Sequence, residues 1–112
     1  MIRREDYGKL VRDKIPSLLA DDKTVEGYGI HVIEDKYKLK HMRTKLREEI
    51  EEYFDSKSPD ELVDILEIIF AIAEWGGINK FQLLDLMERK GKTNGVFDSF
   101  YYLRFVDRRV EE

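Results

Sequence analysis

Apolar residues recur every three or four positions between Lys36 and Asp55, which predicts an amphipathic helix over this range. The repeating positions are Leu39, Met42, Leu46, Ile50 and Tyr53. This spacing places them along one side of a helix. A shorter helix is expected from Pro16 to about Ala20, because proline fits the first position of a helix. The residues from Lys9 to Ile15 would then lie on a loop.

A second long helix is predicted to begin at Pro59 and to end at Gly76-Gly77. Ser58 would cap it, and Glu61 would complete a capping box. Eleven of the fourteen residues from 62 to 75 are apolar, and at about 100° per residue they cover nearly the whole circumference. Such a helix is typical of the inside of a bundle.

The rest of the chain contains one more long helix and two irregular segments. The third helix should begin at Asn79, its N-cap, with Ile78 as a hydrophobic staple, and run to about Lys90. Residues 91–95 are expected to form a flexible basic turn. Residues 25–33 alternate glycines with apolar residues, which predicts a short strand or an irregular arm. Residues 96–106 are too aromatic to lie free in water and predict a strand or an interface segment.

The composition is typical of one soluble domain, so residues 1–112 are expected to fold as a single unit. The chain is 42% hydrophobic and 39% charged, has a formal net charge of -4 and contains no cysteine. The lack of cysteine excludes disulfides, thiolate nucleophiles and cysteine-based zinc sites. The acidic balance argues against duplex nucleic acid as a partner. With no apolar stretch long enough for a membrane and no secretory signal, we expect a cytoplasmic location.

The short connection between the two long helices brings acidic residues together. About three residues join the helices, so they should form an antiparallel hairpin. At 1.5 Å rise per residue, Glu52 lies level with Glu61, and Glu49 lies level with Asp64. Four carboxylates can therefore converge, which is costly unless a cation neutralises them. Oxygen ligands favour magnesium, with manganese as a substitute. The alternative is an ordinary solvated helix surface, which Asp64, with its apolar neighbours, fits least.

Three segments of the sequence resemble a known family. Glu48-Glu49-x-x-Glu52 followed by Glu61-x-x-Asp64 resembles the paired metal motif of the MazG-type all-α nucleoside triphosphate pyrophosphohydrolases, which include phosphoribosyl-ATP pyrophosphohydrolase. Residues 9–16, Lys-Leu-Val-Arg-Asp-Lys-Ile-Pro, resemble the opening of a short single-domain branch of this superfamily. Residues 90–97 stand where the family has a basic loop and a Gly-x-Phe. The resemblance covers about residues 7–100 and implies an all-α helical bundle built on a metal-binding hairpin.

The resemblance also implies a reaction, namely hydrolysis of a nucleoside triphosphate between the α and β phosphates, as in the removal of noncanonical nucleotides. The implied magnesium ligands are Glu49, Glu52, Glu61 and Asp64. Glu48 and Glu49 are the candidate catalytic residues, and Glu48 or Glu67 would orient water or hold a second metal ion. The candidates for binding the substrate, with Asp13 orienting Arg12, are Lys9, Arg12, Lys14, Lys90, Lys92 and Asn94.

Two other functions stay open at this point. The first is hydrolysis of phosphoribosyl-ATP in histidine biosynthesis. The second is a non-catalytic helical module that mediates dimerisation or binds a nucleotide, although the intact set of carboxylates favours an enzyme. A nearly all-apolar helix in a chain with so few helices also predicts self-association. The resemblance likewise implies a dimer or a tetramer.

Overall fold

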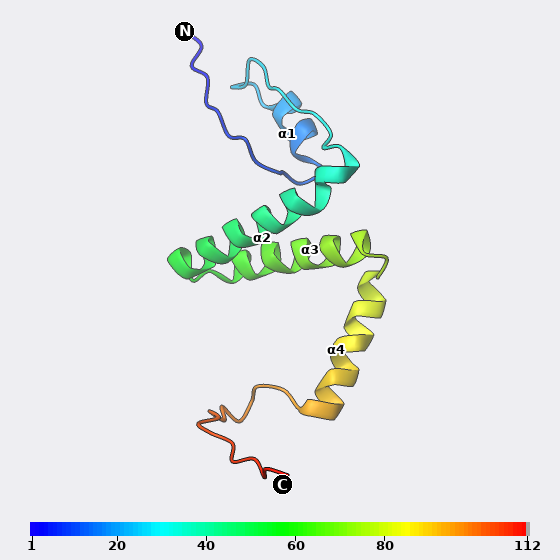
Figure 1. Cartoon of the computed structure of the whole chain (residues 1–112). Coiled ribbons are helices and arrows are strands. Elements are labelled where there is room, and N and C mark those ends of the chain that lie inside the picture. Colours follow the sequence, from blue (N-terminus) through cyan, green and yellow to red (C-terminus); the bar gives the residue numbers. More distant parts are fainter. Residues whose placement is uncertain (112) are drawn as a thin grey trace.

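The computed structural model describes residues 1–111 and contains four helices (Figure 1). In chain order they are α1 (Ile15–Asp21), α2 (Asp35–Ser56), α3 (Pro59–Trp75) and α4 (Lys80–Asn94). No strand occurs among residues 1–111, so the described chain is all-α, as expected. Residues 25–33 form an irregular arm, which is one of the two predicted alternatives. No helix within the described range is long and apolar enough to cross a membrane.

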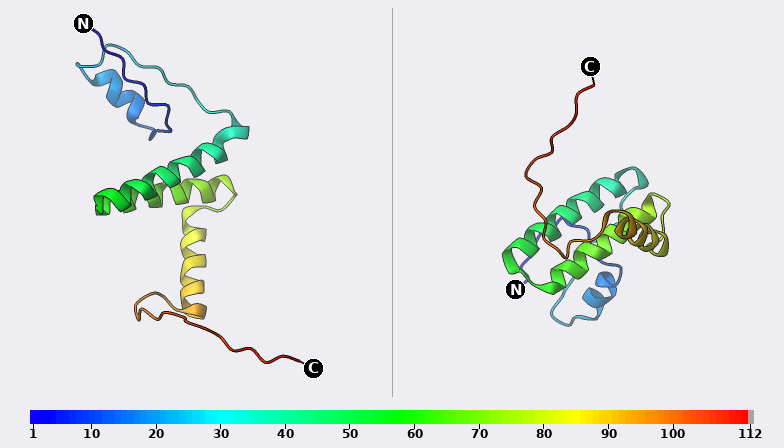
Figure 2. Two further views of the ribbon diagram at one scale, coloured as in Figure 1. Left: turned by 60° about the vertical axis from the view of Figure 1, so that its left-hand side comes forward. Right: turned by 90° about the horizontal axis from the view of Figure 1, so that it is seen from below.

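Helices α2 and α3 lie side by side and run in opposite directions (Figures 1 and 2). The chain reverses at Lys57, whose backbone is left-handed (φ 56°) and whose N–H donates to the carbonyl of Tyr53 at 2.7 Å. Ser58 then caps α3, and its hydroxyl accepts from the N–H of Asp60 at 3.2 Å. This tight reversal places the C-terminal half of α2 beside the N-terminal half of α3.

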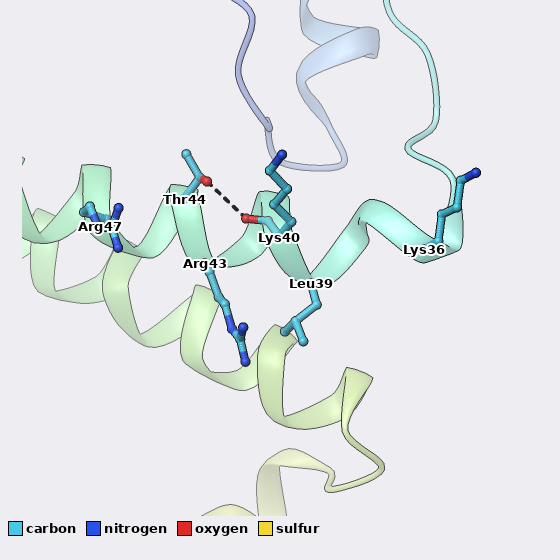
Figure 3. A pocket seen from close by; sticks show the side chains of 6 residues that line it. All are labelled: Lys36, Leu39, Lys40, Arg43, Thr44 and Arg47. Carbon is cyan, nitrogen blue, oxygen red and sulfur yellow. Dashed lines mark hydrogen bonds between the residues drawn. The ribbon is translucent and has the colours of Figure 1, made fainter.

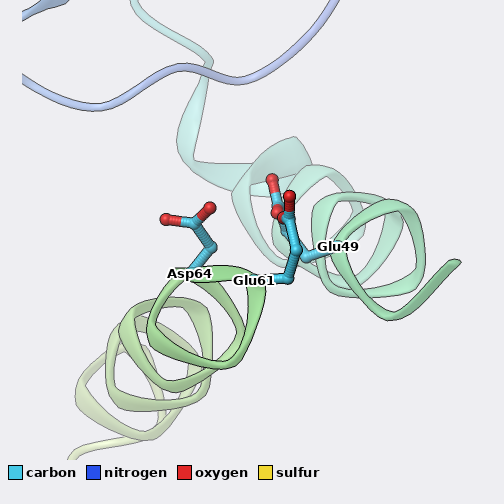
Figure 4. A group of neighbouring side chains, drawn as sticks. All are labelled: Glu49, Glu61 and Asp64. Carbon is cyan, nitrogen blue, oxygen red and sulfur yellow. The ribbon is translucent and has the colours of Figure 1, made fainter. Parts of the chain in front are cut away.

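The prediction that Glu61 completes a capping box at the start of α3 is wrong. The N–H of Glu61 bonds to the carbonyl of Ser58 at 3.1 Å, but its side chain lies beside Glu49 of α2 (Figure 4). A capping box is found instead at the start of α4, where Asn79 was expected only to cap the helix. The side chain of Asn79 accepts from the N–H of Gln82 at 2.9 Å, and that of Gln82 accepts from the N–H of Asn79 at 2.8 Å.

Helix α4 continues through Gly91, so the flexible turn expected over residues 91–95 is wrong. The helix ends at Asn94 and is capped by Gly95, whose φ is 83° and whose N–H bonds to the carbonyl of Gly91 at 2.8 Å. Lys90, Lys92 and Asn94 therefore lie on a helix. Figure 1 shows α4 leaving the end of α3 at a steep angle and running away from the α2–α3 pair.

Much apolar surface stays exposed in the single chain. Within residues 1–111, Met42 is the only apolar residue that is buried. The segment after α4 is extended and contains no strand up to residue 111, so the strand alternative for residues 96–106 is wrong (Figure 2). The radius of gyration is 20.4 Å, whereas a compact domain of this length has about 13 Å.

Candidate metal centre

Three carboxylates from α2 and α3 come together at the paired helices (Figure 4). They belong to Glu49 of α2 and to Glu61 and Asp64 of α3, and one oxygen of each lies within 4.8 Å of the others. Glu61 and Asp64 are three residues apart, so they lie on adjacent turns of the same side of α3. The antiparallel packing supplies Glu49 from the facing helix. We call these three residues the carboxylate cluster.

Burial makes the carboxylate cluster costly as it stands. Glu49 is only 5% exposed, and Glu61 and Asp64 are half-buried. Among the described residues, nothing donates a hydrogen bond to the buried Oε2 atoms of Glu49 and Glu61. A buried carboxylate oxygen without a donor is unfavourable, and a cation can supply the missing partner. Three oxygen donors with two free buried oxygens therefore fit a hard divalent ion.

The pKa of Glu61 is raised by the same unfavourable burial of negative charge. Burial raises the pKa of this carboxyl above its usual value, and the neighbouring carboxylates of Glu49 and Glu52 raise it further. Glu52 is itself exposed and lies outside the carboxylate cluster. The structure thus brings three of the four expected ligands together and leaves the fourth at their edge. Bound positive charge would act on Glu61 in the opposite direction, favouring its ionised form.

Lys45 is a basic residue of the site that the sequence analysis did not single out. Its Nζ lies 3.2 Å from Oε1 of Glu49 and 3.9 Å from Oε2 of Glu48, and its side chain is only 17% exposed. Glu49 is therefore neutralised through one oxygen while the other stays free for a ligand. The signal was present in the sequence, because a lysine four residues before a glutamate lies next to it on a helix.

Arg12 reaches the carboxylate cluster from the segment before α1. Its Nη2 donates to Oδ1 of Asp64 at 2.5 Å, across 52 positions of sequence. This hydrogen bond raises the pKa of the Arg12 guanidinium, and the charges of Asp64, Glu67 and Glu49 act in the same direction. Arg12 is thus held by Asp64 rather than by Asp13. Of the basic candidates, it is the one placed directly on an expected ligand.

The other expected substrate-binding residues lie elsewhere. Lys9 is exposed, with its Nζ 5.3 Å from the centre of the Tyr7 ring. Lys14 is exposed at the N-cap of α1. Lys90, Lys92 and Asn94 lie in the last turns of α4, which starts from the opposite end of α3 and runs away from the cluster (Figure 1). A single chain therefore does not bring these three residues to the carboxylates.

A second, basic hollow lies along α2 (Figure 3). It has a volume of about 360 Å³, and its lining consists of Lys36, Leu39, Lys40, Arg43, Thr44 and Arg47. Arg47 is two positions from Glu49, which is about 160° around a helix. The hollow therefore faces away from the carboxylate cluster and belongs to a separate surface.

Comparison of this chain with protein-family models, with curated proteins and with solved structures found no match. The features from which a function can be inferred are the carboxylates of Glu49, Glu61 and Asp64 and the two cations beside them, Lys45 and Arg12. They combine carboxylate oxygens that could hold a metal ion with a guanidinium, a group suited to phosphate.

Proposed function

We propose that the protein is a magnesium-dependent hydrolase that splits a nucleoside triphosphate between its α and β phosphates, releasing a monophosphate and pyrophosphate. The observation that supports this most is the pair of buried, unpartnered Oε2 atoms of Glu49 and Glu61 within the carboxylate cluster. The resemblance of the Glu-Glu-x-x-Glu and Glu-x-x-Asp segments to the MazG-type motif supports the choice of reaction.

Glu49, Glu61 and Asp64 would hold the ion, with Glu52 beside Glu61 as the fourth carboxylate. Oxygen ligands suit magnesium, and manganese should replace it. When bound, the ion supplies positive charge to the phosphates and makes a nearby water more acidic. Lys45 would keep Oε1 of Glu49 occupied, so that the other oxygen faces the ion.

The chain's own cations are needed because carboxylates repel a polyphosphate. Arg12 is the best placed, since it already lies at Asp64 and a guanidinium can bind two phosphate oxygens at once. Lys9 and Lys14, on either side of it in sequence, would add charge to the same approach. Glu48 adjoins Glu49, and Lys45 pairs with both residues. We therefore propose that Glu48 orients the attacking water.

The test is a panel of canonical and noncanonical nucleoside triphosphates incubated with the protein and magnesium. We expect pyrophosphate and monophosphate in equal amounts, no product in chelator, and recovery with magnesium or manganese. Glu51→Gln removes an exposed carboxylate of α2 outside the cluster and should behave as the wild type. Orthophosphate as the first product, or no product from any triphosphate, would contradict the proposal.

A further inference from the structure

The segment before α2 is tied to the carboxylate cluster by a single ion pair. Within residues 1–111, Arg12–Asp64 is the only ion pair that joins residues more than four positions apart. Helix packing joins α2 to α3 and α3 to α4. The Arg12–Asp64 pair is therefore the polar link that holds the segment before α2 at the site, within residues 1–111.

Two positively charged groups, the proposed metal ion and Arg12, compete for the carboxylate of Asp64. It is one of the three carboxylates expected to hold the metal ion, yet its Oδ1 already accepts from Arg12. A guanidinium and a divalent cation side by side on one carboxylate would repel each other strongly. The Arg12 side chain is 55% exposed and that of Asp64 is 36% exposed, so the arginine can leave into water at little cost.

We propose that Arg12 and the divalent metal ion bind Asp64 in turn, so that metal binding releases Arg12 and the segment that carries it. The freed guanidinium then binds the phosphates of the incoming nucleotide, which returns the segment to the site. In the metal-free protein Arg12 takes the place of the ion and offsets the charge of the cluster. This inference rests on the proposed function, because it requires the metal ion and a polyphosphate at this site.

Magnesium affinity gives the first test. Arg12→Gln removes the competitor and should bind magnesium about fivefold more tightly than the wild type in a calorimetric titration. Arg3→Gln is the matched control, since it removes the same charge from the same segment at an exposed side chain that pairs with the neighbouring Glu5. We expect Arg3→Gln to match the wild type.

Motion of the segment gives a second test that needs no turnover. The chain has no cysteine, so a single spin label can be placed through Ser17→Cys, at an exposed position of α1. The label should be restrained without metal, more mobile with magnesium, and restrained again when a triphosphate with a non-hydrolysable α–β bridge is added. In Arg12→Gln it should be mobile in all three conditions.

The outcomes separate this inference from the function on which it rests. No magnesium binding by the wild type would overturn both. Magnesium binding that is equal or weaker in Arg12→Gln, or a label whose mobility does not change with magnesium, would overturn the inference and leave the metal centre standing.

Discussion

Glu49 is the residue at which burial and charge conflict most directly. It is 5% exposed, Lys45 neutralises one of its oxygens, and the other oxygen has no donor among the described residues. Helical periodicity explains the burial, because Glu49 borders the apolar side of α2. Charged groups are rarely buried without full pairing. A carboxylate kept there at a cost to stability is a candidate for a functional group.

Replacing Glu61 with glutamine should stabilise the metal-free protein at neutral pH. Because the pKa of Glu61 in the folded chain is raised above its usual 4.5, the folded state binds this proton more tightly than the unfolded state. The contribution of Glu61 to stability is therefore present below pH 4.5 and is lost as pH rises through the folded pKa. Thermal unfolding in chelator should show a higher Tm for Glu61→Gln at neutral pH and a smaller gain below pH 4.5. An equal gain at both would contradict this.

Asp64→Asn should abolish most turnover, because it removes the charge of a proposed metal ligand and weakens its pairing with Arg12. Loss of one such electrostatic element commonly lowers the rate by about a hundredfold or more. The variant should also lose most of the rise in Tm that magnesium produces, since that rise follows affinity for the folded state. Asp85→Asn, at an exposed aspartate paired with Arg89 on α4, is the control. Turnover and Tm shift within about twofold of the wild type would argue against a metal role for Asp64.

At the scale of elements, local signals predicted the helices well. Apolar spacing predicted α2 as residues 36–55, and the structure has Asp35–Ser56. Ser58 and Asn79 were expected as caps and act as caps. The errors occur where local chemistry is ambiguous. Gly91 could end a helix or lie within one, and the Glu61 side chain could turn to its own N-cap or toward Glu49. Packing of α3 against α2 determines the direction of the Glu61 side chain, and residue spacing alone cannot predict it.

Gly91→Ala tests the correction to α4 directly. If Gly91 lies within a helix, alanine should stabilise the protein by about 0.5–1 kcal/mol, because glycine loses more backbone entropy on folding. The added Cβ would lie 3.6 Å from Cγ1 of Val96, an ordinary contact. Gly95→Ala should instead destabilise, since its φ of 83° strains any residue with a side chain. Urea unfolding measures both. A loss of stability in Gly91→Ala would favour a turn.

The candidate site was predictable only as far as spacing fixes geometry. Helix rise and a short connection place Glu49 level with Asp64, and Glu61 one turn away on the same side of α3. The structure brings one oxygen of each within 4.8 Å of the others. Spacing does not determine side-chain rotamers, which is why Glu52 could not be told apart from the other three. Nor does it encode a contact between Arg12 and Asp64 across 52 positions. That pairing depends on the path of the whole N-terminal segment.

The single chain exposes more surface than a compact monomer of its size. Its accessible surface is 11,291 Å², whereas a compact monomer of 13.4 kDa exposes about 6,500 Å². The excess includes apolar side chains on α3, α4 and the C-terminal segment, among them Val63, Phe81, Phe97 and Tyr101. Obligate homodimers bury about 2,000–5,000 Å² in total, so the excess is large enough for a dimer interface. We propose that a second copy of the chain covers this surface.

We therefore expect a dimer or tetramer at micromolar concentration. Light scattering coupled to size-exclusion chromatography gives the mass, and small-angle scattering gives the radius of gyration. A monomeric mass with a radius near the 20.4 Å of the isolated chain would contradict the expectation. Lys90, Lys92 and Asn94 lie at the far end of α4 and do not reach the carboxylate cluster of their own chain. In an assembly they could approach the carboxylate cluster of another copy.

Titration of magnesium into Glu49→Gln, beside Glu51→Gln and the wild type, tests whether the carboxylate cluster binds a metal ion. Both variants remove one carboxylate from α2, but Glu49 belongs to the carboxylate cluster and Glu51 is exposed outside it. We expect similar magnesium affinity in the wild type and Glu51→Gln, and affinity lower by about tenfold or more in Glu49→Gln. Equal binding by all three proteins, or none by the wild type, would contradict a metal centre at Glu49, Glu61 and Asp64.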